Sequence, residues 1–218
     1  QLSAAEQRML RQVSVFAGGW TLQAAADVAQ AADEYEALAL LTALHDKSLL
    51  VVDRATAPGG RPRYRMLETV RQYALQRLNE SGEGPAARGR HVDHFITMAE
   101  AAEPQVRGPE QDLWMSRFKQ EHENLVGALT WCCDAAVDAQ SGLRLAAATG
   151  YYWGWNSVEQ GFRLVFAALE HDRAAAPTPA REGTLRALAR LSEFRGRYEE
   201  ALAFAQQALA AARQLGEP

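Results

Sequence analysis

Residues 49–66 read LLVVDRATAPGGRPRYRM. Residues 49–52 are apolar and rich in valine, and residues 63–66 alternate between polar and apolar side chains, so both segments are predicted to be strands. Pro58-Gly59-Gly60 lies between them, in a connection too long for a two-residue hairpin turn. The stretch therefore predicts a two-stranded β-hairpin with a long loop.

Three helices are expected before this hairpin, each opening on a residue that can cap a helix N-terminus. The caps are Ser3, Thr21 and Asp33, and the apolar spacing carries the helices to about Phe16, Ala32 and Asp46, with Gly18-Gly19 ending the first. Three helices followed by a hairpin is the arrangement of a winged helix. A fourth helix is predicted over 68–79, followed by a linker-like run, ESGEGP, at 80–85.

Beyond about residue 86 the pattern is helical throughout, and it repeats. The pair Ala-Leu recurs at 128–129, 168–169 and 208–209, a spacing of 40 residues. This periodicity predicts helix–turn–helix repeats that bury their apolar faces by stacking. The expected fold class is mainly α: a small winged-helix domain with a two-stranded β-hairpin, followed by an α-helical repeat domain.

Composition excludes several classes of protein. The 218 residues have a formal net charge of −4 and are 48% hydrophobic, so no overall positive field attracts nucleic acid or an anionic membrane. The two cysteines, Cys132 and Cys133, are adjacent and are expected to be reduced thiols in a cytoplasmic protein. No apolar run is long enough to span a membrane, and the chain, which opens at Gln1, is expected to be a piece of a longer protein.

Three N-terminal strings are specific enough to suggest a family. They are SVFAGGWTLQAA at 14–25, LLTALHDKSLLVV at 40–52 and RYRMLETVRQYALQRLNESGE at 63–83. They resemble the winged-helix region of STAND signal-transduction ATPases, relatives of the NB-ARC proteins found in bacterial LuxR-type and antibiotic-regulatory-type transcriptional regulators. The string RGPEQDLWMSRFKQEHENLVGALTW at 107–131 resembles the helical segment that follows that region.

The resemblance implies a nucleotide partner outside this chain. In that family a P-loop domain that binds ATP or ADP precedes the winged helix, but the chain has no Gly-x-x-x-x-Gly-Lys-Ser/Thr sequence, so no cofactor is expected here. The family's Met-His-Asp sensor falls on Met66, Leu67 and Glu68. Leu67 cannot donate the hydrogen bond that the family's histidine gives to phosphate. The alternative is that Met66 and Leu67 are ordinary strand-end and core residues.

Local charge argues against DNA reading by the third helix. No Lys or Arg occurs from residue 23 through residue 46, and residues 1–53 carry three basic against seven acidic side chains. Residues 54–90 are more basic, with eight Arg against three Glu. A basic wing can contact phosphate, but the third helix lacks the side chains that read base edges. Direct DNA binding is therefore not expected.

Catalytic and metal-binding signals are weak. His91 and His94 flank Asp93 on a predicted helix, which is half of a metal site at best, and the alternative is two ordinary histidines. The sequence contains no HExxH, GxSxG or CxxC motif. The chain is expected to be non-enzymatic.

The segment LRALARLSEFRGRYEEALAFAQQAL at 185–209 resembles a tetratricopeptide repeat, with Ala189, the Gly-x-Tyr-x-x-Ala turn at 196–201 and Ala208 in place. It departs from that family in its period and at Ser192, where Tyr is usual. In such repeats the first helix of each unit lines a concave groove. The resemblance places there Leu143, Ala146, Gly150 and Trp153 from one unit, and Gly183, Arg186, Arg190, Glu193 and Phe194 from the next.

Arg186 and Arg190 lie one helical turn apart, so the interpretation is that they hold a carboxylate or an acidic peptide, with an exposed Trp153 as an anchor. The alternatives are solvated arginines and an aromatic cluster in which Tyr152 and Trp155 fill the interface between repeats.

Three domains are expected: a winged helix at 1–80, a helical linker or first helical pair at 81–138, and tetratricopeptide-like repeats at 139–218. The leading hypothesis is a non-catalytic regulatory fragment of a STAND-type transcriptional regulator. Its winged helix would relay the state of the protein's own nucleotide-binding domain, and its repeats would bind an effector or partner protein. The alternative is a DNA-binding winged-helix module with an oligomerising tail. An enzyme with a helical cleft has the least support.

Overall fold

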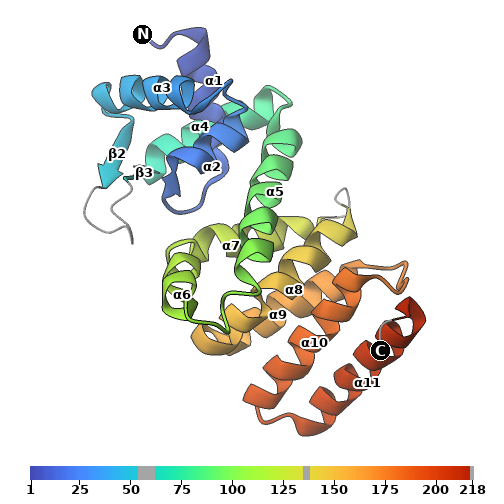
Figure 1. Ribbon diagram of the computed structural model, residues 1–218. Helices are drawn as coiled ribbons and strands as arrows, with labels where there is room; N and C mark the ends of the chain where they lie inside the picture. Colours follow the sequence, from blue (N-terminus) through green and yellow to red (C-terminus); the bar gives the residue numbers. More distant parts are fainter. Residues whose placement is uncertain (54–61, 135–137, 217–218) are drawn as a thin grey trace. The chain divides into compact units, whose positions relative to one another are not determined.

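The computed structural model describes residues 1–53, 62–134 and 138–216 (Figure 1). The chain divides into two compact units. Unit 1 comprises Gln1–His94 with Gln120–Gly127, and unit 2 comprises Phe95–Lys119 with Ala128–Pro218. This division differs from the boundaries expected after residues 80 and 138. Helices α5 (Gly84–Ala102) and α7 (His122–Cys132) each contribute residues to both units.

Unit 1 opens with α1 (Ala4–Gln12), which begins at the predicted capping box. The Glu6 amide donates to Ser3 Oγ at 3.2 Å, and the Ser3 amide donates to Glu6 Oε2 at 2.7 Å. The α-helix ends at Gln12 and tightens into the 3₁₀ turn η1 (Val13–Val15). The glycine pair at 18–19 therefore follows the helix instead of ending it.

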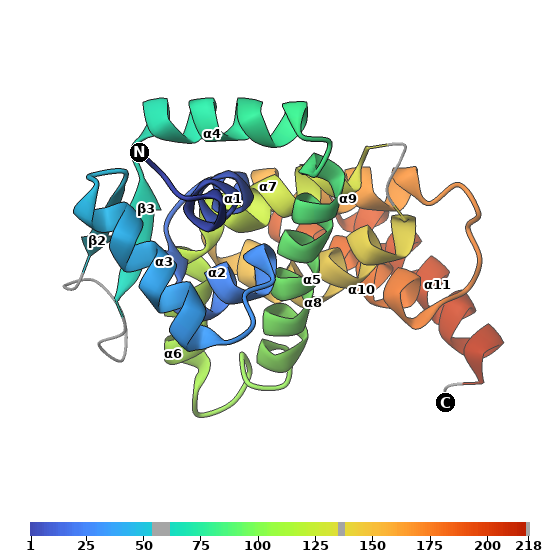
Figure 2. The same ribbon diagram turned by 90° about the horizontal axis from the view of Figure 1, so that it is seen from above.

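Helices α2 (Leu22–Ala29) and α3 (Glu34–Asp46) begin at the predicted caps. Thr21 Oγ1 accepts from the Ala24 amide at 3.2 Å, and Asp33 Oδ1 accepts from the Glu36 amide at 2.8 Å. Helix α2 is shorter than predicted, because Gln30 takes a left-handed φ of 54° and breaks the helical repeat before Ala32. Figure 2 looks almost along α1, with α4 on one side of it and α2 and α3 on the other.

Among the residues that the structure describes, the sheet has three strands, so the predicted two-stranded hairpin was incomplete. Its strands are β1 (Trp20–Thr21), β2 (Leu50–Asp53) and β3 (Arg63–Met66), in the spatial order β1-β3-β2 and antiparallel throughout. Trp20 pairs with Tyr64. A two-residue strand has no alternation of its own, which is why the sequence pattern missed β1. The predicted loop at Pro58-Gly59-Gly60 lies outside the described residues.

Helix α4 (Glu68–Glu80) matches the predicted fourth helix to within one residue. Only residues 81–83 separate it from α5, and Gly82 turns the chain there with a φ of 75°. The predicted linker at 80–85 is therefore a tight turn, because Gly84 and Pro85 already belong to α5. Proline is tolerated in the first turn of a helix, where its missing N–H would have no intrahelical partner.

The core of unit 1 forms around an aromatic cluster. The Phe16 ring stacks on the Trp20 indole with centroids 5.2 Å apart, and it meets the His91 imidazole edge-on at 5.0 Å. All three side chains are buried. The helices and strands add further buried apolar side chains: Leu10, Val13, Val28, Ala37, Leu41, Leu44, Leu50, Leu78 and Val92.

Unit 2 includes two successive helix pairs (Figure 1). They are α8 (Ala139–Asn156) with α9 (Val158–His171), and α10 (Pro179–Phe194) with α11 (Tyr198–Leu215). Helix α8 packs on both α9 and α10, and α10 packs on α11. A turn at Gly196, with a φ of 71°, joins the second pair. Helix α6 (Gln111–Gln120) precedes these pairs.

Two glycines let neighbouring helices touch α8 directly. A Cβ atom on Gly161 of α9 would lie 2.2 Å from Trp153 Cβ, and one on Gly150 of α8 would lie 2.4 Å from Ala187 Cβ. Helix α8 is thus enclosed from two directions. As a consequence Tyr152 and Trp153 are almost entirely removed from solvent.

Candidate functional site

Helix α3 has one buried face and one exposed face. Ala37, Leu41 and Leu44 are completely buried against the core. On the opposite side Tyr35 is 83% exposed and Leu38 is 42% exposed. Tyr35, Leu38 and the exposed Thr42 share one side of the helix because they recur at three- and four-residue intervals. We call these three residues, with the exposed Glu34 and Asp46, the outer α3 face.

The charges on this face are acidic. Glu34 and Asp46 are exposed, and the helix contains no Lys, Arg, Asn or Gln. The next cation along the chain, Lys47, donates to Glu6 Oε1 at 2.5 Å. A helix that reads the major groove uses such basic or amide side chains at base edges, with cations opposite the phosphates. The outer α3 face therefore offers no basic or amide side chain for such contacts.

Four of the eight arginines in residues 54–90 contact acceptors elsewhere in the chain. Arg63 pairs with Glu121, Arg71 with Glu68, and Arg77 with Glu80. Arg90 donates to the Val28 carbonyl and to Gln12 Oε1, both at 2.6 Å. These four guanidinium groups have acceptors, whereas Arg65 is exposed and Arg54 and Arg61 lie outside the described residues.

The sensor-like positions lie where β3 passes into α4. Met66 is half-buried and pairs with Leu50, whereas Leu67 is 49% exposed. Glu68 accepts from Arg71 Nε and Nη2, each at 2.9 Å, and from Gln72. The Arg71 and Gln72 hydrogen bonds lower the pKa of Glu68 to about 2. The exposed Leu67 is not a core residue, so that part of the alternative interpretation is wrong.

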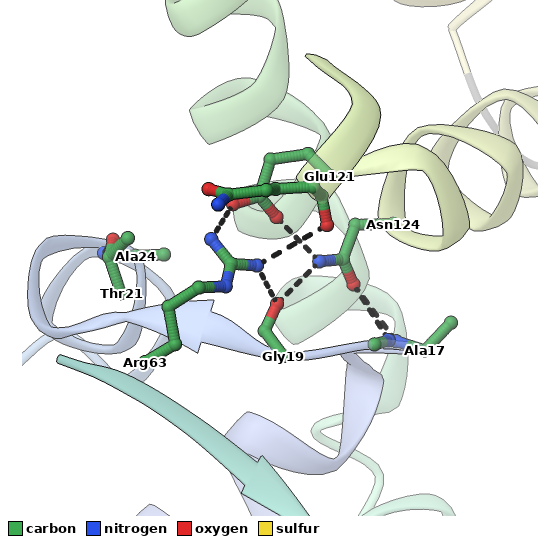
Figure 3. Close-up of polar contacts among 9 residues, drawn as sticks. Ala17, Gly19, Thr21, Ala24, Arg63, Glu121 and Asn124 are labelled. Atoms are coloured by element: carbon green, nitrogen blue, oxygen red, sulfur yellow. Dashed lines mark hydrogen bonds and ion pairs between the residues drawn. The ribbon is translucent and has the colours of Figure 1, made fainter. Parts of the chain in front are cut away.

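A buried polar network holds the turn between η1 and β1 (Figure 3). Arg63, on β3, forms an ion pair with Glu121, and its Nη2 donates to the Gly19 carbonyl at 2.6 Å. Asn124 Nδ2 donates to the same carbonyl at 2.9 Å and to Glu121 Oε2 at 2.8 Å. Asn124 Oδ1 accepts from the Ala17 amide at 3.0 Å and from the Gly18 amide at 3.3 Å.

This Arg63–Glu121–Asn124 network explains why Gln120–Gly127 belongs to unit 1. The side chains of Arg63 and Glu121 are only 10% and 9% exposed, and Asn124 is fully buried. Buried charges are tolerated when they are paired and hydrogen-bonded. The network thus fixes the start of α7 against the turn at 17–19 and the first residue of β3.

The two histidines do not form a metal centre. His91 is buried, and its desolvation lowers the pKa to about 3, so the imidazole is neutral near pH 7. His94 Nδ1 lies 2.6 Å from Asp27 Oδ2. Across residues 1–53, 62–134 and 138–216, no group of three or more His, Cys, Asp or Glu side chains is arranged to hold a metal. Cys132 is buried and Cys133 is half-buried, and burial raises the pKa of the Cys133 thiol.

Trp153 is not an exposed anchor, so that prediction was wrong. Its side chain is completely buried and its Nε1 donates to Thr149 Oγ1 at 3.0 Å. The predicted groove residues Leu143, Ala146 and Gly150 are buried as well. The alignment with tetratricopeptide repeats placed the groove on the side of α8 that packs against its neighbouring helices. In the interface interpretation Tyr152 is buried as expected, but Trp155 is 65% exposed.

The predicted α10 residues are nearer the surface, but Arg186 and Arg190 do not form the expected pair. Arg186 Nε contacts Glu182 Oε1 at 3.0 Å, one turn earlier. Arg190 is half-buried and lies over the Tyr151 ring, 5.5 Å from its centroid. Glu193 is exposed, and Phe194 is 52% exposed with its ring centroid 6.5 Å from that of Trp155. The sequence pattern missed Tyr151 and Arg107 as neighbours of Arg190.

Residues 2–79 match the family described as "Winged helix-turn-helix domain". Residues 2–79 form a winged helix-turn-helix domain. Over its whole length the chain is 34% identical to the "Putative HTH-type transcriptional regulator Rv0890c" of Mycobacterium tuberculosis and to the like-named Mb0914c of Mycobacterium bovis. The chain spans 25% of the length of each of these curated relatives.

The chain is also 42% identical over 98 residues to the "Uncharacterized protein Rv0894" of M. tuberculosis. This match covers 43% of this chain and 24% of that relative. No solved structure gives a significant match. Within the helices that the structure places, none combines the length and apolar character needed to cross a membrane.

Proposed function

We propose that this chain is the winged-helix and helical-repeat segment of a STAND-type transcriptional regulator, and that its winged helix contacts protein instead of reading DNA. The observation that carries this proposal is the outer α3 face. In a winged helix-turn-helix domain the second helix of the motif is the one that enters the major groove. Here that helix presents Tyr35 and Leu38 with two exposed carboxylates, Glu34 and Asp46.

The physical argument rests on desolvation and charge. Moving exposed Tyr and Leu side chains against another polypeptide removes apolar surface from water, which is favourable. Placing Glu34 and Asp46 near DNA phosphates brings like charges together and releases no counterions. Exposed aromatic and aliphatic side chains on one helix face are the usual mark of a protein contact.

The partner in this proposal is the nucleotide-binding domain of the same regulator. The support is the resemblance of the strings at 14–25, 40–52 and 63–83 to STAND winged-helix regions. In this scheme ATP or ADP is bound by that domain, and a change in nucleotide state alters which surfaces pack together. The helix pairs of unit 2, read as tetratricopeptide-like repeats, receive an effector or partner protein.

DNA binding is the second candidate, and two observations favour it. The relatives carry the name of HTH-type regulators, and residues 54–90 contain eight arginines. Against it, Arg63, Arg71, Arg77 and Arg90 are engaged within the fold.

A DNA titration separates the two candidates. We would follow the fluorescence anisotropy of a labelled duplex of about 30 base pairs in about 10 mM salt, where the Debye length is about 30 Å and electrostatic binding is strongest. We expect no saturable binding below about 100 µM protein, and no gain from Glu34→Gln. Micromolar binding that weakens steeply with salt and tightens in Glu34→Gln would overturn the proposal, because it would place α3 beside phosphate.

A further inference from the structure

Helices α8 and α10 and the residues that follow α5 enclose a hollow in unit 2. Its lining includes Arg107, Tyr151, Arg186 and Arg190, with Glu103 as the acidic residue. The lining also includes the small residues Ala147, Gly150 and Gly183. Its volume is about 80 Å³, which is room for a few water molecules or for one carboxylate or phosphate group.

Two of these arginines converge on one aromatic ring. The guanidinium carbon of Arg107 lies 5.4 Å from the Tyr151 ring centroid, and that of Arg190 lies 5.5 Å from it. The Tyr151 hydroxyl accepts a hydrogen bond from Gln111 Nε2 at 2.7 Å, which fixes the ring. A ring held in this way positions both guanidinium groups by cation–π attraction.

The two cations have no ion-pair partner of their own. In the part of the chain that the structure describes, no carboxylate lies within 4 Å of Arg107 or Arg190. The other lining arginine, Arg186, is paired with Glu182. The pKa of Arg190 is lowered by desolvation and then by the positive charge of Arg107, while Tyr151 and Glu193 raise it by smaller amounts and Arg186 lowers it least. This corner of unit 2 therefore holds positive charge that an anion would neutralise.

A larger groove adjoins the hollow. It has a volume of about 510 Å³ and shares Glu103, Ala147, Gly183 and Arg186 with the smaller hollow. Its remaining charged residues are paired: Arg144 Nε and Nη2 each contact a Glu100 carboxylate oxygen at 2.8 Å, and Glu182 contacts Arg186. Sites for small molecules have volumes of about 300–1,000 Å³. The groove thus has the size for the body of a small polar ligand.

We propose that Arg107, Tyr151 and Arg190 form a binding site for the carboxylate or phosphate group of a small polar organic anion, whose remaining atoms occupy the adjoining groove. Guanidinium groups bind both kinds of oxyanion through charge-assisted hydrogen bonds. The site goes beyond the proposed function of the winged helix, and it corrects the pairing expected from the sequence. Arg190 acts with Arg107, which is remote in the sequence, and not with Arg186.

The test is an NMR titration of the ¹⁵N-labelled chain with citrate and, separately, with inorganic phosphate. The backbone amides of Gly150 and Gly183 and the Arg Nε–H groups report on the site directly. We expect saturable shifts at these positions with at least one anion. Each of Arg107→Gln and Arg190→Gln should weaken binding by about tenfold or more, since each removes a charge-assisted contact. Comparing the two anions shows whether carboxylate or phosphate is the preferred group.

Arg163→Gln is the matched control, because Arg163 is exposed on α9 and does not line either hollow. Its affinity should stay within about twofold of the parent, because distant surface charges are screened. The far-UV circular dichroism and melting temperature of Arg107→Gln and Arg190→Gln should match those of the parent, which guards against a loss caused by misfolding. Equal weakening in all three arginine variants would mean only a general charge effect. That result, or the absence of saturable shifts up to about 20 mM of either anion, overturns the proposal.

Discussion

Breaking the ion pair between Arg63 and Glu121 should destabilise unit 1 strongly. In Glu121→Gln the Arg63 guanidinium stays buried, with its side chain 10% exposed, but it loses its counter-charge. Removing one partner of a buried pair typically costs about 3–5 kcal/mol, and we expect about 3 kcal/mol because Gln keeps the shape and can still bond Asn124. The carbonyls of Gly19 and Gln120 remain as acceptors for Arg63.

The assay is urea denaturation of the whole chain, followed by NMR through the Trp20 indole signal, which reports on unit 1. Trp20 lies on β1 within the core. With a denaturant dependence of about 1–3 kcal/mol per molar urea, a loss of 3 kcal/mol lowers the midpoint by about 1–3 M. The matched control is Glu80→Gln, which breaks the exposed pair with Arg77 and should cost less than about 1 kcal/mol.

A double-mutant cycle identifies the interaction itself. Arg63→Met combined with Glu121→Gln should cost less than the sum of the two single changes by about 1.5 kcal/mol or more, because the second change no longer strands a buried charge. If the single changes add to within about 0.5 kcal/mol, or if Glu121→Gln behaves like Glu80→Gln, the network does not hold unit 1 together and the reasoning is refuted.

Three further changes test other parts of the structure. Gly161→Ala places a methyl group 2.2 Å from Trp153 Cβ and should destabilise unit 2 by about 3 kcal/mol in thermal melts. The control is Gly89→Ala, whose methyl group meets nothing within 4 Å and which should be neutral or stabilising. Between pH 6.5 and 5 His91 becomes protonated in the unfolded chain, whereas in the folded chain the His91 pKa of about 3 keeps it neutral. The free energy of unfolding should therefore fall by about 1.5 kcal/mol as the pH drops, and His91→Leu should remove that loss. A pH dependence in His91→Leu equal to that of the parent would contradict the burial argument. Gly196→Ala forces a side chain into a φ of 71° and should cost about 1–2 kcal/mol, and an unaltered melting temperature would show that the turn relaxes freely.

Much of unit 1 was predictable from local sequence signals. The caps at Ser3, Thr21 and Asp33 are chemical features of single residues, so the helix starts were confirmed. The alternation at 63–66 correctly predicted β3. Strand β1 was missed because its two residues are defined only by their pairing with Tyr64 and Arg63, a long-range contact that local periodicity does not contain.

The candidate sites in unit 2 were harder to predict, because they depend on which side of each helix packs inward. Helical spacing, taken with the family's register, placed Trp153 and Gly150 on one face, but it did not reveal that Gly161 would pack on Trp153 and Ala187 on Gly150. The Arg107–Tyr151–Arg190 cluster joins residues that are distant in sequence, so no motif could signal it. In contrast, the acidic and apolar character of the outer α3 face follows from composition and helical periodicity.

The central claim is that the outer α3 face contacts polypeptide. It is tested most directly by hydroxyl-radical footprinting of Tyr35, which is 83% exposed in this chain. The comparison is between this chain and a longer product of the same gene that includes residues preceding Gln1. The account predicts that Tyr35 reacts readily in the short chain and is protected in the longer product without DNA. Equal reactivity in both, with protection appearing only when duplex DNA is added, would contradict it.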